Sequence, residues 1–185
     1  MLKFNHISNQ AISNNGLEKF YEDNKEFHEN IIIPSWPEYF LKLAAEAAKR
    51  SKDAQTQCGC VMTDHQNHIL ATGYNSFVRG LDDSRMPNLR PNKYKWMRHA
   101  EINALDNRTT NFWQYPKGVI AYVTSRPCFN CTQSMWANNV TTIIYGDYSE
   151  PKMCEGETQD EKDFKLLLNM LQSKLTVIEI LRENK

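Results

Sequence analysis

Two short segments of this 185-residue chain carry the residue types that hold a catalytic metal, and they restrict the fold because they must meet in space. The first segment contains His99 and Glu101, and the second is a Pro-Cys-x-x-Cys run with Cys128 and Cys131. One imidazole and two thiolates hold Zn²⁺ and leave its fourth tetrahedral position open to water. Zinc lowers the pKa of such a water, and Glu101, two residues from a ligand, is placed to carry the proton.

Both segments are expected to lie at the N-termini of helices. A proline fits the first turn of a helix, so Pro127 predicts a helix whose first turn carries Cys128 and Cys131 on one face. The partial positive charge of that end favours the thiolate form. A second helix is predicted to begin at His99. The chain must therefore fold so that two helix N-termini converge on one metal.

A closed structural zinc site is the first alternative, and it needs a fourth protein ligand. Further cysteines and histidines are available, none at the usual paired spacing of zinc ligands: Cys58, Cys60, Cys154, His65 and His68. A redox Cys-x-x-Cys pair is a second alternative, but it leaves the segment of His99 and Glu101 unexplained. We expect Cys58 and Cys60 to be small core residues and the two other histidines to be solvated.

Composition narrows the class of partner and the compartment. The chain has 22 Lys and Arg against 22 Asp and Glu, so it has no global basic field that would gather nucleic acid. Five cysteines without a regular framework suit a reducing compartment, and the cytoplasm is therefore expected. No apolar run approaches the roughly 20 residues that cross a bilayer. A small-molecule substrate is favoured over a polynucleotide or a membrane.

The hydrophobic pattern predicts an α/β domain with one mixed sheet. A helix is expected from about residue 36 to 51, capped by Ser35 with Glu38 as its capping-box partner. A hairpin with strands at 58–63 and 69–74 follows. The later elements are the His99 helix, a strand at 119–124, a helix at 128–138, a strand at 141–145, a helix at 160–172 and a strand at 175–180. A hairpin followed by crossovers gives five strands with helices on both faces.

Residues 75–98 are predicted to form a long irregular loop, which is uncommon in a compact domain unless the loop is functional. Basic side chains on it are candidates to meet a phosphate, although loop cations are more often simply solvated: Arg79, Arg85, Arg90 and Lys93. At the N-terminus, residues 1–33 are interpreted as an appendage. Residues 34–185 would then form a single domain.

With these motifs in place, the chain resembles the deoxycytidylate (dCMP) deaminases of the zinc-dependent cytidine deaminase superfamily. The resemblance covers roughly residues 36–180. Besides the two metal segments it rests on Trp36-Pro37-Glu38-Tyr39-Phe40, Arg50-Ser51-Lys52-Asp53, Gly73-Tyr74-Asn75 and Ile102-Asn103-Ala104. It implies a three-layer α-β-α fold and the hydrolysis of dCMP to dUMP and ammonia, which feeds dTMP synthesis.

The same resemblance implies roles for particular residues. One Zn²⁺ would be held by His99, Cys128 and Cys131. Glu101 would carry protons between water and the base. Asn75 would hydrogen-bond the substrate sugar, although asparagine also fits a turn at that place. Tyr148 would lie near the substrate phosphate.

The sequence departs from the family pattern where nucleotide effectors bind. Relatives under allosteric control by dCTP and dTTP usually carry Gly-Tyr-Asn-Gly-x-Pro after the second strand, whereas this chain has Ser76 and Val78 at the last glycine and the proline. Glycine permits a close approach and a positive φ that serine resists. The departure counts against an effector, with or without Mg²⁺. The resemblance also implies a homo-oligomer, a hexamer in relatives.

Two other functions remain open from the sequence. A tRNA adenosine deaminase shares the metal centre but acts on a base flipped out of RNA, and it would need a basic face. A catalytically silent module could retain zinc as a structural element, but it would have no need of Glu101. Ammonia release from dCMP, compared with release from an RNA hairpin, separates these possibilities.

Overall fold

The computed structural model of this protein describes residues 18–19, 22, 32–146 and 158–181. The chain divides into two compact units, residues 1–34 and residues 35–185, and the elements named here belong to the second. In chain order they are α3 (Trp36–Ala48), β1 (Gly59–Thr63), β2 (Ile69–Tyr74), β3 (Ser76–Phe77), η1 (Asp83–Arg85), η2 (Asn92–Lys95), β4 (Met97–Arg98), α4 (Ala100–Asn107), η3 (Phe112–Gln114), β5 (Val119–Val123), α5 (Phe129–Ala137), β6 (Val140–Gly146), α6 (Gln159–Leu171), η4 (Gln172–Lys174) and β7 (Thr176–Ile180), where η marks a 3₁₀ helix.

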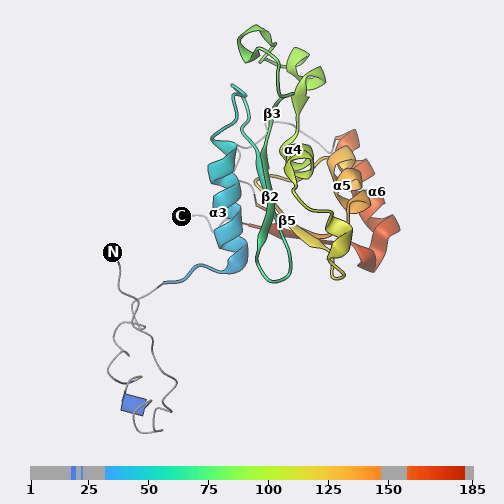
Figure 1. The fold of residues 1–185 in the computed structure, drawn as a ribbon. Coiled ribbons are helices and arrows are strands. Elements are labelled where there is room, and N and C mark those ends of the chain that lie inside the picture. The colour runs from blue at the N-terminus through green and yellow to red at the C-terminus, as the bar shows by residue number, and fades with distance from the viewer. Residues whose placement is uncertain (1–17, 20–21, 23–31, 147–157, 182–185) are drawn as a thin grey trace, which may run out of the picture. The chain divides into compact units, whose positions relative to one another are not determined.

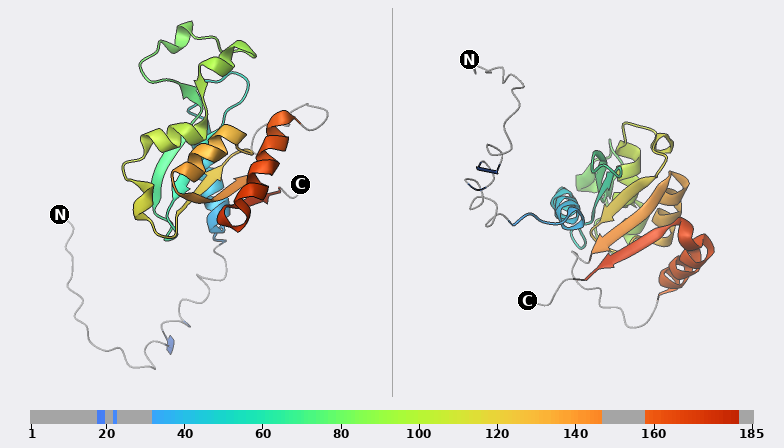
Figure 2. Two further views of the ribbon diagram at one scale, coloured as in Figure 1. Left: turned by 90° about the vertical axis from the view of Figure 1, so that its right-hand side faces the viewer. Right: turned by 90° about the horizontal axis from the view of Figure 1, so that it is seen from below.

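The five longer strands form one mixed sheet in the order β2-β1-β5-β6-β7. β1 pairs antiparallel with β2 and β5, whereas β6 lies parallel to both β5 and β7. Figure 1 shows α3 on one face of this sheet, and the left view of Figure 2 looks onto the other face, which α4, α5 and α6 cover. The predicted three-layer α/β fold is confirmed.

Alternating side chains of the strands fill a separate core on each face of the sheet. Val61 of β1 and Tyr122 of β5 pack with Phe40 under α3. Cys60 and Met62 point the opposite way, into the larger cluster under α4 and α5. All five residues of β1 are buried, because helices cover both faces of this central strand.

Two glycines allow helices to lie directly against the strands. A Cβ at Gly73 in β2 would stand 2.3 Å from the Ala100 carbonyl oxygen and 2.3 Å from the Ala104 nitrogen. A Cβ at Gly59 would stand 1.9 Å from the Ala44 carbonyl oxygen. No real side chain fits these distances, so the sequence sets the closeness of α4 and α3 to the sheet.

The predicted helix starts are largely confirmed. Ser35 caps α3, since its Oγ accepts from the Glu38 N–H at 3.4 Å, but the Glu38 carboxylate pairs with Lys42 at 2.7 Å. A complete capping box forms instead at α6, between Thr158 and Glu161. α3 ends at Ala48, earlier than predicted. Among the described residues no helix has both the length and the apolarity needed to span a membrane.

The stretch 75–98 is more ordered than the sequence indicates. Its two ends pair as a short antiparallel ribbon, with Ser76 opposite Arg98 and Phe77 opposite Met97. Between them the chain makes η1 and η2, above the sheet in Figure 1. The prediction of an irregular loop was therefore wrong at both ends, because a strand of two residues leaves no alternating pattern to detect.

Candidate metal centre and active site

The three predicted metal ligands lie together where α4 and α5 begin. His99 is the N-cap of α4, Cys128 is the N-cap of α5, and Cys131 lies in the first turn of α5. Their ligand atoms all lie within 4.8 Å of one another. No other group of His, Cys, Asp or Glu with such spacing occurs in the described part of the chain.

The spacing of these atoms fits a tetrahedral zinc ion. His99 Nδ1 lies 3.5 Å from Cys128 Sγ and 3.4 Å from Cys131 Sγ. Zinc holds nitrogen at about 2.0–2.1 Å and sulfur at about 2.3 Å, so two such ligands at a tetrahedral angle stand roughly 3.6 Å apart. The Cys131 N–H also donates to Cys128 Sγ at 3.5 Å, so the helix N-terminus stabilises a thiolate there.

The two thiols compete for a single negative charge. Hydrogen bonding with Cys131 lowers the pKa of the Cys128 thiol to about 4, and the same contact raises the pKa of Cys131. The hydrogen bond with Cys128 raises the pKa of the His99 imidazole. A divalent cation bound between these groups favours the thiolate at both sulfurs and a neutral imidazole, so it removes the competition.

Glu101 lies beside the ligands without being one of them. It belongs to the first turn of α4 and is only 5% exposed. Burial raises the pKa of its carboxyl, and the nearby His99 imidazole opposes that rise. A carboxyl whose pKa is raised toward neutrality exchanges protons more readily at physiological pH, which is the property a general acid–base group needs.

A cavity of about 170 Å³ opens beside the metal ligands, and Glu101 and Asn75 both line it. Asn75 follows β2 and is buried. Its Oδ1 accepts from the Cys58 N–H at 2.7 Å, and its Nδ2 donates to the Thr56 carbonyl at 2.8 Å and to Asp53 at 3.1 Å. Both amide N–H bonds are therefore used within the protein, and only the oxygen retains capacity for a substrate group.

A buried ion pair also borders the cavity, and nothing in the sequence pattern indicates it. Lys93 Nζ lies 2.6 and 2.7 Å from the two carboxylate oxygens of Asp53, and each side chain is 3% exposed. Burial acts to raise the pKa of Asp53, but hydrogen bonds from Lys93, Gln55 and Thr56 outweigh it and lower the pKa. The pair is 40 residues apart in sequence, so only the tertiary fold brings it together.

The remaining candidates from the sequence lie elsewhere. Cys60 is fully buried in the core, and Cys58 packs against that core. The two hairpin histidines contact the turn and a neighbouring loop: His65 Nε2 lies 2.9 Å from the Lys117 carbonyl, and His68 Nδ1 lies 2.9 Å from Asp64. Tyr148 and Cys154 fall outside the described residues.

The fold and the site define the class of protein. Residues 34–147 match the family described as the cytidine and deoxycytidylate deaminase zinc-binding region, so the chain belongs to this family. Deoxycytidylate deaminases of Pongo abelii and Homo sapiens are each 33% identical to it over 116 residues, which are 60% of this chain. The matched part spans 64% of the length of each of these relatives.

A solved structure shows the same fold. The dCMP deaminase of the cyanophage S-TIM5, in complex with dCMP and dUMP, superposes with a TM-score of 0.55 at 19% identity. The comparison covers 81% of this chain and 100% of the phage protein. The fold class and the family resemblance predicted from the sequence are confirmed.

Proposed function

We propose that this chain is a zinc-dependent deaminase that converts dCMP to dUMP and ammonia. The observation that carries the proposal is one cavity lined by His99, Cys128 and the buried carboxyl of Glu101. Cys131 completes the set of three ligand atoms beside this cavity. Several relatives of this chain are deoxycytidylate deaminases. This supports a nucleoside monophosphate with a cytosine base as the substrate, rather than an adenosine in RNA. Residues 34–185 would form the catalytic domain and residues 1–33 an appendage.

The reaction needs one proton carrier beside the metal. Zn²⁺ held by His99, Cys128 and Cys131 supplies water that is acidic enough to lose a proton near neutral pH. Glu101 accepts that proton and gives it to ring nitrogen N3, which makes C4 of cytosine electrophilic. After the water oxygen has bonded to C4, Glu101 takes the proton that remains on this oxygen and delivers it to the amino group. The C4–N bond then breaks, the C4 carbonyl forms and ammonia leaves.

Substrate contacts are proposed for two more residues. Asn75 would accept a hydrogen bond from a sugar hydroxyl through Oδ1, because its N–H bonds are already satisfied within the protein. Tyr148 is retained as a phosphate neighbour on the family resemblance alone. A reducing compartment such as the cytoplasm suits Cys60, Cys128 and Cys131, which are free thiols.

Assembly and regulation belong to the same proposal. We expect a homo-oligomer, a hexamer by family resemblance. A second cavity of about 640 Å³ is lined by residues of the 75–98 stretch, among them Ser76 and Val78. Since Ser76 Oγ also accepts from Asn103 at 3.0 Å, we expect dCTP or dTTP, with Mg²⁺, to act more weakly here than where glycine and proline occupy these positions.

The direct test is ammonia release by the zinc-loaded protein from dCMP, CMP, deoxycytidine and dCTP, each with and without dCTP or dTTP as effector. The expected result is a clear preference for dCMP. An RNA hairpin with a target adenosine serves as the comparison substrate. Release from the hairpin and none from dCMP would overturn the proposal in favour of a tRNA deaminase, and no release from any substrate would leave a silent zinc module.

A further inference from the structure

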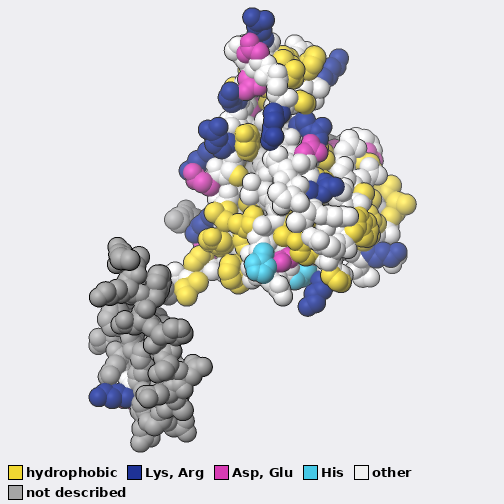
Figure 3. Space-filling model, in the orientation of Figure 1, with side chains coloured by type: hydrophobic (Ala, Val, Ile, Leu, Met, Phe, Trp, Pro, Cys, Tyr) yellow, Lys and Arg dark blue, Asp and Glu magenta, His cyan; other side chains and the backbone are white. Residues whose placement is uncertain are grey.

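The basic side chains of the 75–98 stretch do not all face the same site. Figure 3 shows Lys and Arg side chains, mixed with acidic ones, over the part of the molecule that this stretch forms above the sheet. Arg79 lines the second cavity, and Arg85 pairs with Asp82 at 3.2 Å. Arg90 and Lys93 line the cavity beside the metal centre, and Arg126, which follows β5, joins them there.

Two of these three cations are already neutralised by carboxylates. Lys93 is held by Asp53 in the buried ion pair. Arg126 Nη2 lies 3.3 Å from Asp160 and 3.6 Å from Glu161. A phosphate entering the cavity would therefore compete with an existing carboxylate at either position.

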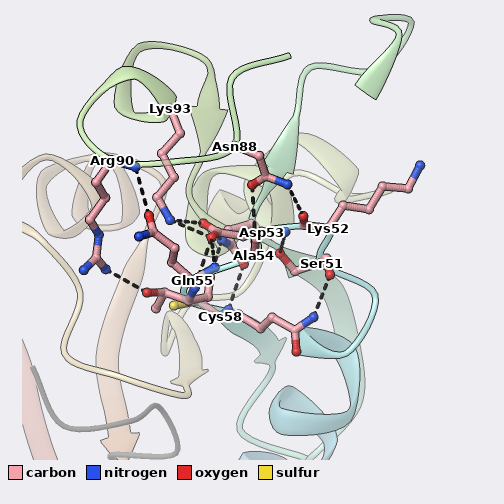
Figure 4. Close-up of polar contacts among 12 residues, drawn as sticks. Ser51, Lys52, Asp53, Ala54, Gln55, Cys58, Asn88, Arg90 and Lys93 are labelled. Atoms are coloured by element: carbon pink, nitrogen blue, oxygen red, sulfur yellow. Dashed lines mark hydrogen bonds and ion pairs between the residues drawn. The ribbon is translucent and has the colours of Figure 1, made fainter. Parts of the chain in front are cut away.

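Arg90 is different because its partners are uncharged. Its backbone N–H donates to Gln55 Oε1 at 2.9 Å, and its Nη2 donates to Thr56 Oγ1 at 2.7 Å (Figure 4). Within the described residues it makes no ion pair with a carboxylate. A guanidinium has five N–H donors in a planar fork, so most of its hydrogen-bonding capacity and all of its charge remain available.

The stretch that carries Arg90 is fixed in place. Besides the ion pair between Lys93 and Asp53, Asn88 donates to the Lys52 carbonyl at 2.6 Å and accepts from the Ala54 N–H at 3.2 Å. Figure 4 shows these contacts joining the stretch to the segment after α3. Arg90 is thus an exposed cation held by an anchored backbone.

The cavity beside the metal ligands is too small to enclose a whole nucleotide. At about 170 Å³ it is smaller than the roughly 300–1,000 Å³ that encloses a drug-sized ligand. With the base at the metal ligands, the 5′-phosphate of a nucleotide would lie at the rim, where Arg90 is exposed.

We propose that Arg90 binds the 5′-phosphate of the nucleoside monophosphate substrate and so makes the site prefer the nucleotide over the nucleoside. The inference rests on the proposed function for the base and the reaction. Arginine suits this role because its fork binds two phosphate oxygens at once.

The test compares Arg90→Gln with Arg85→Gln, a matched change at an exposed cation of the same stretch. In Arg90→Gln we expect the KM for dCMP to rise at least about tenfold while kcat stays within about threefold, since only substrate binding is weakened. Arg85→Gln should leave both constants unchanged. Arg90→Lys should recover part of the lost affinity, because it keeps the charge without the fork.

Two results would overturn the assignment: an unchanged KM in Arg90→Gln, or an equal fall of kcat/KM for dCMP and deoxycytidine. Calorimetric binding of dUMP to the zinc-loaded protein separates this failure from that of the proposed reaction. If the wild type releases no ammonia but binds dUMP, and Arg90→Gln loses that binding, the reaction is wrong and the phosphate site stands. If both proteins bind dUMP equally, the phosphate site is wrong.

Discussion

The position of Glu101 is determined by helix geometry, whereas its burial is determined by the packing of the core. It lies two residues after the cap residue His99, in the first turn of α4, so a helix that presents the imidazole to a metal also brings this carboxyl near. Its burial beside Cys60 is a product of the fold: burial raises the pKa of the Cys60 thiol, and the Glu101 carboxylate adds to that rise. Cys60 is therefore held as a neutral thiol, and Glu101 is the carboxyl that we propose as the proton carrier.

The change Glu101→Gln tests that role. Glutamine keeps the shape of the side chain but cannot carry a proton, so deamination should fall by about 10²–10⁴ while zinc content and Tm are retained. Ammonia release, metal analysis and a thermal melt measure the three quantities. Glu46→Gln, an exposed change on α3, is the control. A Glu101→Gln protein with more than about a tenth of the wild-type rate would contradict the assignment.

At the scale of elements, the order of helices and strands can largely be predicted from the sequence. Caps, alternation and the hairpin turn are local signals, and they gave β1, β2 and α4 close to their observed bounds. The anchoring of the 75–98 stretch could not be predicted, because it depends on Asp53 meeting Lys93 across 40 residues. No sequence pattern distinguishes Lys93, which is buried, from the exposed basic residues around it.

The change Asp53→Asn tests the anchor. It leaves the Lys93 ammonium buried without a carboxylate, so the free energy of unfolding should fall by about 3–5 kcal/mol in urea denaturation. Glu38→Gln breaks the exposed ion pair with Lys42 and should cost only about 0–1 kcal/mol. Similar values for the two variants would show that the buried pair contributes no more than a surface pair.

The lowered pKa of Asp53 fixes how this difference depends on pH. A carboxyl with a depressed folded-state pKa contributes its full stability above its unfolded pKa of about 3.9 and loses it as the pH falls through the folded value. The gap between wild type and Asp53→Asn should therefore be constant near neutral pH and shrink only below about pH 4. A gap that shrinks between about pH 7 and pH 5 would contradict this reasoning.

At the scale of the whole molecule, the metal site joins two elements that contact the sheet at different strands. α4 packs on β2 and α5 packs beside β6, so an ion shared by His99, Cys128 and Cys131 ties distant parts of the sheet together. The convergence of the two helix N-termini could be predicted from the sequence, because His99, Cys128 and Cys131 must meet to hold one metal. The cavity beside them could not, because its walls come from four separate segments.

Removing zinc should therefore weaken the fold as well as the activity. An ion present at about 1,000 times its dissociation constant stabilises the native state by about 4 kcal/mol. For a domain of this size a chelator should lower Tm by about 8–16 °C, and added zinc should restore it. In Cys128→Ser the melting curve should no longer respond to the chelator. A wild-type Tm that the chelator leaves unchanged would exclude a stabilising metal.

The packing at Gly73 restricts which residues evolution can accept there, because this position supports the helix of the metal site. Since its missing side chain is what lets the backbone of α4 rest on β2, any mutation there would displace the helix that presents His99 and Glu101. Three residues further on, Ser76 is partly exposed in a two-residue strand, and its Oγ accepts a hydrogen bond from Asn103. That contact depends on side chains, whereas the contact at Gly73 is with the backbone of α4. Over evolution we therefore expect substitutions to accumulate around the second cavity, while position 73 stays glycine.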